Sequence, residues 1–133
     1  MNLIIWRDTY ETGIPEVDRQ HRSLVDITNE LIGAHQKQTG RFIIYGILDR
    51  LVEYTKIHFS DEEKLFDTGY TGAVKHRQEH DYFILELDKL QQEAARNNLL
   101  LTYKTLDFLK DWLINHILGT DKELGTYIAN KGK

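Results

Sequence analysis

The stretch AVKHRQEHDYFILELDKL, residues 73–90, decides the fold of this chain. Steps of three and four, taken in alternation from Ala73, pass through two histidines to an apolar run, a spacing that keeps side chains on one helix face. The pattern predicts a helix over about residues 72–96, ended by the Asn97-Asn98 pair. The positions on that face are Ala73, His76, His80, Phe83, Leu87 and Leu90.

Apolar residues repeat at the same helical spacing in three further segments. They predict helices over about residues 18–38, 41–66 and 100–118. Pro15 before the first of these segments favours a helix start, and Gly40 after it favours a stop. The apolar positions are Leu24, Ile27 and Leu31 in the first segment, Ile44, Ile47, Leu48, Leu51 and Leu65 in the second, and Leu106, Leu109, Leu113 and Ile117 in the third.

Helices joined by short connections pack against one another as antiparallel neighbours. Because strand-like alternation is absent from the sequence, we predict an all-α fold, an antiparallel up-down-up-down four-helix bundle. An N-terminal arm over residues 1–17 precedes the bundle. A short C-terminal helix over about residues 120–129 follows, since Thr120 and Glu123 have the spacing of a capping box. No linker-like run divides the chain, so we expect a single domain over residues 1–133.

Composition excludes several classes of protein. The chain has 133 residues and no cysteine, which leaves histidine and carboxylate side chains as its strong metal ligands and rules out disulfides, iron–sulfur clusters held by thiolates and cysteine-type zinc sites. A formal net charge of −4, with both signs mixed along the chain, offers no basic surface for nucleic acid. Neither a signal peptide nor an apolar run of ~18 residues is present, so we expect a cytoplasmic protein with no membrane span.

Each of the four predicted helices carries at least one histidine in register with its apolar residues. Glu62 lies four residues after His58 and three before Leu65, so a carboxylate faces inward as well. One buried imidazole is ordinary, but five in one core with an ionised carboxylate are costly unless a cation neutralises them. The sequence therefore predicts a metal site in the bundle. The five histidines are His21, His58, His76, His80 and His116.

Asp121 is a candidate ligand whose spacing does not fit a regular helix. It lies five residues after His116, which in an α-helix turns the two side chains ~140° apart. We expect the chain to bend at Gly119 and a new helix to start in the Thr120 capping box, with Asp121 in its first turn.

Five short segments together resemble the bacterial hemerythrins, and the resemblance runs from Trp6 to the C-terminal helix. The chain departs from the family at Tyr70-Thr71, where a Tyr-Pro pair is frequent, and at Leu65-Phe66, where a methionine is common; these positions concern the loop and the packing. The matching segments are Gly13-Ile14-Pro15, Asp18-x-Gln20-His21-x-x-Leu24, His58-Phe59-x-x-Glu62-Glu63, His76-x-x-Glu79-His80 and Trp112-Leu113-x-Asn115-His116-Ile117-x-x-x-Asp121.

The resemblance implies two non-haem iron ions (Fe2+/Fe3+) joined by a bridging oxo or hydroxo group. His76, His80 and His116 would bind one iron, and His21 and His58 the other. Glu62 and Asp121 would bridge the two ions. Six donors then complete the first iron, whereas the second keeps one open position, where dioxygen would bind end-on.

By the same resemblance, apolar side chains surround the dioxygen pocket. For each of them ordinary core packing is the competing interpretation. Glu63 and Glu79 are interpreted as solvated or as partners of ligands, and His35 as a surface residue. The predicted pocket residues are Leu24, Phe59, Trp112, Leu113 and Ile117.

Four functions remain open from the sequence. The first is reversible dioxygen binding for oxygen transport, storage or delivery, with an oxygen-consuming client protein of unknown identity. The second is an oxygen or redox sensor module. The third is a di-iron enzyme that handles peroxide or nitric oxide, which the lack of a separate acid, base or nucleophile group disfavours. The fourth is a metal-free interaction scaffold. We expect an oxygen-binding protein and not an enzyme.

Overall fold

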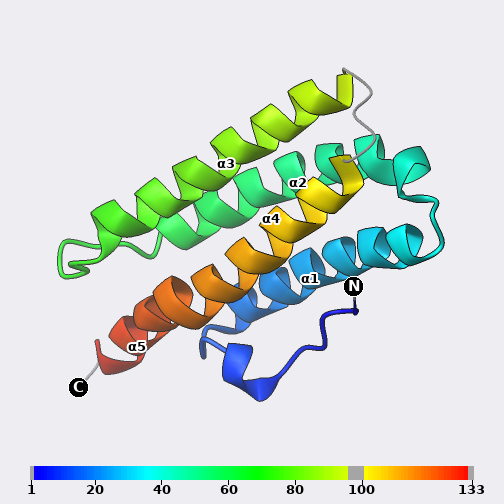
Figure 1. Cartoon of the computed structure of the whole chain (residues 1–133). Coiled ribbons are helices and arrows are strands. Elements are labelled where there is room, and N and C mark those ends of the chain that lie inside the picture. The colour runs from blue at the N-terminus through cyan, green and yellow to red at the C-terminus, as the bar shows by residue number, and fades with distance from the viewer. Residues whose placement is uncertain (1, 96–100, 132–133) are drawn as a thin grey trace.

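Four long helices run antiparallel in chain order in this computed structural model, which describes residues 2–95 and 101–131 (Figure 1). The bounds of these helices are Pro15–Gln36 for α1, Gly40–Glu63 for α2, Ala73–Ala95 for α3 and Leu101–Asn115 for α4. A π-helix, His116–Asp121, continues α4 directly into the short helix α5, Lys122–Asn130. Across the described ranges no strand occurs, and the predicted all-α bundle with an arm and a short last helix is confirmed.

The apolar positions of the four helices form one core. Side chains with no exposed area come from every long helix. The predicted stripe residues are buried except Ala73, which is partly buried, and Leu65, which is partly buried and lies beyond the end of α2 at Glu63. In α1 the helix begins at Pro15, three residues before the expected start, because proline fits the first helical position, where a backbone N–H has no partner to lose. No helix in the described part of the chain is long and apolar enough to cross a membrane. The fully buried core residues include Leu31, Leu51, Phe83, Leu87, Leu106 and Leu109.

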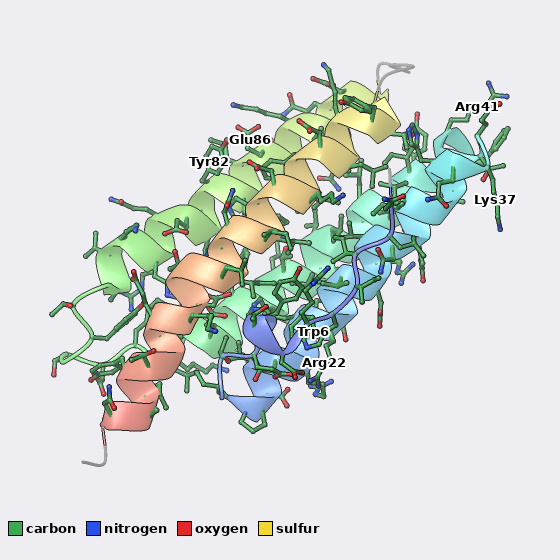
Figure 2. The ribbon with its side chains drawn as sticks, turned by 60° about the horizontal axis from the view of Figure 1, so that its bottom comes forward. Trp6, Arg22, Lys37, Arg41, Tyr82 and Glu86 are labelled. Atoms are coloured by element: carbon green, nitrogen blue, oxygen red, sulfur yellow. The ribbon has the colours of Figure 1, made fainter. Side chains whose placement is uncertain are left out.

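The N-terminal arm lies along α1 and reaches α5. Asn29 on α1 accepts a hydrogen bond from the Ile4 backbone N–H at 2.7 Å and donates one to the Ile4 carbonyl at 2.8 Å. Farther along the arm, Trp6 packs under the guanidinium of Arg22, as Figure 2 shows. The Lys122 amine donates to the Thr9 carbonyl at 3.0 Å. The arm, which includes the 3-10 helix η1, Asp8–Tyr10, therefore ties α1 to the segment that follows the π-helix.

Gly125 of α5 lies in close contact with the arm. A Cβ atom at this position would collide with the backbone carbonyl oxygen of Thr12. A flexible side chain could move out of the way, but this backbone atom cannot. We expect Gly125→Ala to destabilise the protein by about 1–3 kcal/mol, the usual cost of overpacking. Gly33→Ala is the control, because Gly33 lies within α1 and a Cβ there meets nothing within 4 Å. Thermal unfolding should show a lower Tm for Gly125→Ala and an equal or higher Tm for Gly33→Ala; equal losses would contradict the prediction.

Asp18 holds the junction of the arm and α1. Its carboxylate accepts hydrogen bonds from the backbone N–H and hydroxyl of Thr12, both at 2.7 Å, and from Gly13 N–H at 3.2 Å. Burial alone would raise the pKa of Asp18, but these hydrogen bonds lower it below its ordinary value of 3.8. The stabilisation is therefore present above pH 3.8 and is lost as the pH falls through the lower folded-state pKa.

We expect Asp18→Asn to lower the free energy of unfolding at pH 7 by about 1–3 kcal/mol, as for other lost hydrogen bonds to a charged group. The difference from the native protein should shrink when urea unfolding is repeated below pH 3.8. Asp26→Asn, on the exposed side of α1, is the control and should change little at either pH. A deficit that stays constant with pH would show that the Asp18 charge is not responsible.

Candidate metal centre

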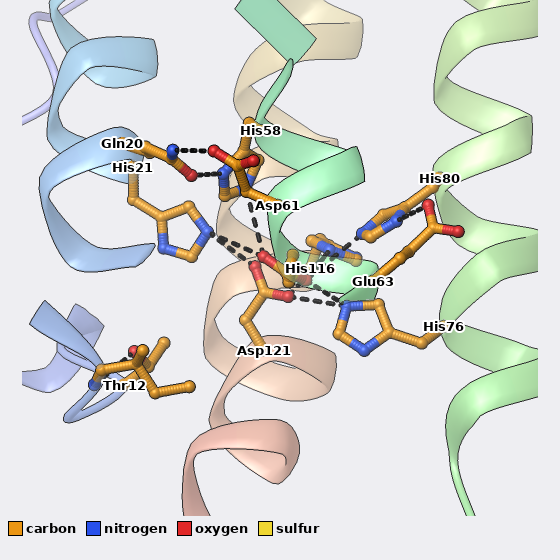
Figure 3. A network of polar contacts seen from close by, with 12 residues as sticks. Thr12, Gln20, His21, His58, Asp61, Glu63, His76, His80, His116 and Asp121 are labelled. Atoms are coloured by element: carbon orange, nitrogen blue, oxygen red, sulfur yellow. Dashed lines mark hydrogen bonds and ion pairs between the residues drawn. The ribbon is translucent and has the colours of Figure 1, made fainter. Parts of the chain in front are cut away.

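Five imidazoles and two carboxylates meet at one end of the bundle (Figure 3). Antiparallel packing brings them together, because the starts of α1 and α3 lie at the same end as the last turns of α2 and α4. None of the seven side chains is more than 2% exposed. The structure thus gathers all seven predicted ligands into one buried cluster: His21, His58, Glu62, His76, His80, His116 and Asp121.

The π-helix explains how Asp121 faces the same centre as His116. Hydrogen bonds from residue i to i+5 place side chains five apart one turn above each other, which an α-helix does not do. The predicted bend at Gly119 is therefore wrong, and so is the capping box. Asp121 has helical backbone angles, φ −69° and ψ −33°, and no side-chain cap starts α5. The Thr120 hydroxyl is directed at Glu79 on α3, to which it donates at 2.7 Å.

The seven donors form two overlapping groups. Within each group the donor atoms lie within 4.8 Å of one another, and Glu62 and Asp121 belong to both. One group adds three histidines to the shared carboxylates, and the other adds two. The larger group contains His76, His80 and His116, and the smaller contains His21 and His58.

The two oxygens of each shared carboxylate face different groups. In Asp121, Oδ2 lies 2.8 Å from His21 Nε2, whereas Oδ1 lies 2.8 Å from His76 Nε2. In Glu62, Oε2 lies 3.2 Å from His58 Nε2, whereas Oε1 lies 3.3 Å from His80 Nε2. A carboxylate arranged in this way can give one oxygen to each of two neighbouring cations.

Several of these buried atoms have no partner with hydrogen-bond geometry among the described residues. They are His21 Nε2, His80 Nε2, His116 Nε2, both oxygens of Glu62 and Oδ2 of Asp121. An unpaired buried polar group costs about 1–3 kcal/mol, so a cluster of them needs a further component. Imidazole nitrogens and carboxylate oxygens directed at common points are a donor set suited to iron. The residues present therefore fit a metal centre.

Without a cation the cluster balances its charge with protons. Burial would lower the pKa of His116, but the nearby Asp121 and Glu79 carboxylates raise it to about 10. Burial and the Asp121 charge would raise the pKa of Glu62, yet the adjacent imidazoles of His58 and His76 lower it to about 2. The pKa of Asp121 also lies well below its ordinary value; burial opposes this shift and the charge of His116 causes it. The carboxylates are therefore ionised, which is the state that binds a metal ion.

In most of the ligand histidines the outer nitrogen, Nδ1, which points away from the centre, contacts a neighbouring polar side chain. His80 Nδ1 donates to Glu63 at 3.1 Å, and His116 Nδ1 donates to Glu79 at 3.0 Å. On the other side, His58 Nδ1 donates to the side-chain oxygen of Gln20 at 2.5 Å. These contacts fix the rings with Nε2 toward the centre, as outer partners of metal-binding histidines do.

His76 has a tyrosine as its outer partner. The Tyr70 hydroxyl lies 3.0 Å from His76 Nδ1, and burial together with nearby carboxylates raises the pKa of Tyr70 to about 12. The sequence alone does not indicate the roles of Tyr70 or Gln20. Gln20 belongs to a matched segment, but its contact partner is on α2, and Tyr70 lies in a loop, so no helical spacing indicates either contact.

Aromatic rings cover the three-histidine group. Phe59 stacks on His80 with 3.9 Å between ring centroids, and Trp112 stacks on His116 at 4.2 Å. Phe59 is buried and Trp112 is partly buried, whereas Leu24, Leu113 and Ile117 are at most 2% exposed in the same core cluster. That these five residues surround a dioxygen pocket stays a prediction. His35, predicted at the surface, is half-buried and lies 6.4 Å from the Tyr103 ring.

Comparison with known proteins agrees with this geometry. A family model described as "Hemerythrin HHE cation binding domain" matches residues 12–128. Two similar curated proteins are both named bacteriohemerythrin. The one from Clostridium acetobutylicum is 33% identical, over 91% of this chain and 98% of its own. The one from Stenotrophomonas maltophilia is 32% identical, over 92% of this chain and 79% of its own. A crystal structure of wild-type hemerythrin superposes with a TM-score of 0.81 at 31% identity, over 94% of this chain and 97% of that one.

Proposed function

Because this chain belongs to the hemerythrin family, we propose that it holds two non-haem irons and binds dioxygen reversibly, for oxygen transport, storage or delivery. The family itself establishes the coarser statement, an oxygen-binding domain with a non-haem iron centre. The single observation that carries the proposal is the pair of donor groups that share Glu62 and Asp121.

In this proposal His76, His80 and His116 hold one iron, His21 and His58 hold the other, and Glu62 and Asp121 bridge them. The three-histidine position receives five donor atoms from the chain, whereas the two-histidine position receives four. A solvent-derived bridge, oxo or hydroxo, would add one donor to each. The unequal count leaves a place for a small ligand next to His21 and His58. When bound, the iron pair would supply electrons to dioxygen on binding and recover them on its release.

The chain's own residues keep this place dry. Leu24 lies one helical turn after His21 and is 2% exposed, which is consistent with an apolar wall on the His21 side of the two-histidine position. Excluding water protects the bound ligand from hydrolysis and slows the irreversible oxidation of the metal.

Replacing Leu24 with alanine should therefore shorten the life of the oxygenated protein. The smaller side chain opens the wall and admits water, and we expect faster autoxidation together with a stability loss of about 2–5 kcal/mol. Leu31→Ala is the matched control on the same helix, since Leu31 is equally buried but lies farther from His21. Decay of the visible absorption in air measures the rate. Equal rates in the two variants would contradict a role of Leu24 at the pocket.

The proposal is tested by one cycle of oxygenation. The protein is loaded with ferrous iron without oxygen, its iron content is measured, and visible spectra are recorded in air and again under vacuum. We expect about two irons per chain and a charge-transfer band that appears with air and disappears under vacuum. Irreversible bleaching, or fewer than one iron per chain, would overturn the proposal.

The same preparation separates the alternatives. Turnover of peroxide or nitric oxide well above that of free iron would favour an enzyme, and capture of a single partner only by the oxygenated form would favour a sensor. The cytoplasmic location and the single domain over residues 1–133 stay predictions, as does the unidentified client protein. Cell fractionation and limited proteolysis test the first two.

A further inference from the structure

The outer partners of the histidines differ between the two metal positions. Behind the three-histidine position stand two carboxylates, Glu63 at His80 and Glu79 at His116. Behind the two-histidine position stands one neutral amide, Gln20 at His58, while Nδ1 of His21 has no hydrogen-bond partner among the described residues. Figure 3 shows Gln20 beside His58 and Glu63 beside His80 on opposite sides of Asp121.

The two carboxylates are fixed in place by other contacts. Both oxygens of Glu79 accept from the Thr120 hydroxyl at 2.7 Å, and Glu63 lies 3.4 Å from the guanidinium of Arg77. Their side chains are 27% and 32% exposed, so water stabilises the negative charge while one oxygen faces the buried ring. These two glutamates are therefore anionic acceptors at defined positions.

Gln20 is also held in one orientation. Its amide nitrogen donates to Asp61 at 3.0 Å, which leaves the amide oxygen to face His58. The amide group carries no net charge, so its oxygen attracts the Nδ1 proton less strongly than a carboxylate oxygen does. Gln20 thus differs from the two glutamates in charge; its contact with His58, at 2.5 Å, is also shorter than their contacts, at 3.0 and 3.1 Å.

We propose that Glu63 and Glu79, opposed to Gln20, make the two metal positions electronically unequal, so that the three-histidine position is the one that becomes ferric first. This inference rests on the proposed two-iron centre and adds which residues set its redox order. An imidazole that donates to a carboxylate becomes a stronger donor to its metal, and a stronger donor stabilises the more highly charged ion. Two such imidazoles serve one position and none serves the other.

The redox step itself is a one-electron oxidation. The ferrous pair loses one electron to a soluble mediator such as ferricyanide, which is reduced to ferrocyanide, and no bond in the protein breaks. The Nδ1 protons stay within their hydrogen bonds. The second iron loses its electron in a separate step at higher potential.

The direct test is a spectroelectrochemical titration of the iron-loaded protein with such mediators. We expect two steps in the native protein. In the Glu63→Gln/Glu79→Gln double variant the first step should move to higher potential, because the loss of an outer partner weakens metal binding roughly 10–100-fold. If the weaker binding affects only the ferric ion, each tenfold loss of affinity raises the one-electron reduction potential by about 59 mV. Gln20→Glu makes the reverse change and should lower the second step, so that both variants bring the two steps closer together.

A matched control and a redox-free measurement complete the test. Glu86→Gln removes a charge from the same helix as Glu79, at a glutamate paired with Lys89, and should leave both potentials unchanged. In zinc-loaded protein labelled with 15N histidine, the Nδ1–H signals of His80 and His116 should lie downfield of that of His58. They should move upfield in the double variant.

The outcomes separate this inference from the proposed function. Two irons with potentials that do not change in the double variant, or that shift equally in Glu86→Gln, would overturn the inference and leave the two-iron centre intact. Failure to bind two metal ions at all would overturn the proposed function. If Glu79→Gln unfolds the protein, the Glu63→Gln single variant and Gln20→Glu still give shifts of opposite sign.

Discussion

Replacing Glu62 with glutamine will empty both metal positions together. Glu62 is buried without exposed area, and its two oxygens face different donor groups, so one substitution removes a ligand from each. Glutamine keeps the size of the side chain but removes its charge and turns one oxygen into an N–H2 donor. We expect a loss of iron affinity larger than the roughly 10–100-fold that follows loss of an outer partner. Iron content per chain after anaerobic loading measures it.

Glu63→Gln is the control for that experiment, since Glu63 is the adjacent residue and contacts the outer nitrogen of His80 and not the metal-facing Nε2. It should retain clearly more iron than Glu62→Gln, because it loses an outer partner and not a ligand. Circular dichroism should show the native helix content in both variants, which separates metal loss from unfolding. If Glu62→Gln retained one iron per chain at native affinity, Glu62 would belong to one position only, and the shared geometry would not be a bridge.

The helical bundle could be predicted because its signal lies in side-chain spacing. Ala73, Phe83 and Leu87 repeat at steps that only one regular structure satisfies, and the histidines occupy the same register. The inward direction of His76 and His80 therefore follows from the pattern alone. Antiparallel topology then brings all the histidine-bearing ends together, so the sequence suffices to predict that one cluster forms.

The path of the chain between His116 and Asp121 could not be predicted in this way. A π-helix depends on which backbone carbonyl each N–H reaches, and side-chain spacing does not indicate that choice. Gly119 favours a bend, yet the chain continues as a helix through it. The spacing of five residues between His116 and Asp121 was itself the signal. An α-helix would turn Asp121 away from the centre, so a helix of different pitch is needed to bring both side chains to it. A local conflict of this kind is typical of functional sites.

The side chains that contact the Nδ1 atoms of the histidines could not be predicted from the sequence either, for a different reason. Glu79 and His116 are 37 residues apart and on different helices, so their contact depends on the relative rotation of α3 and α4. Periodicity shows which face of each helix is buried, but only to within about one side chain. That precision cannot distinguish a solvated glutamate from one that hydrogen-bonds a metal-binding histidine. The resemblance identifies the ligands but does not identify their partners.

Removing the metal will lower the stability of the protein and make that stability fall at alkaline pH. A ligand present at about 1,000 times its Kd stabilises the folded state by ~4.1 kcal/mol. For a chain of this length that corresponds to a Tm lower by roughly 10–20 °C in the metal-free protein. Differential scanning calorimetry of chelator-treated and iron-loaded protein, both kept anaerobic at pH 7, measures the difference.

The pH dependence of the metal-free protein follows from the protons that replace the cations. The pKa of His116 rises from 6.5 to about 10 on folding, so its contribution is complete below pH 6.5 and is lost as the pH rises toward 10. The pKa of Glu62 falls from 4.5 to about 2, so its contribution is complete above pH 4.5 and is lost as the pH falls toward 2. We therefore expect the metal-free protein to be most stable between about pH 4.5 and 6.5.

Iron-loaded protein should lack the alkaline part of this profile, because the metal ion takes the place of the His116 proton. Urea unfolding at pH 6 and pH 9.5, with and without iron, tests this. His35→Gln is the control, since His35 lies outside both donor groups, and its metal-free form should lose stability at pH 9.5 as the native chain does. Equal stability of the metal-free protein at the two pH values would mean that the carboxylates are neutralised by something other than histidine protons, and the reading of the cluster as a cation site would lose its support.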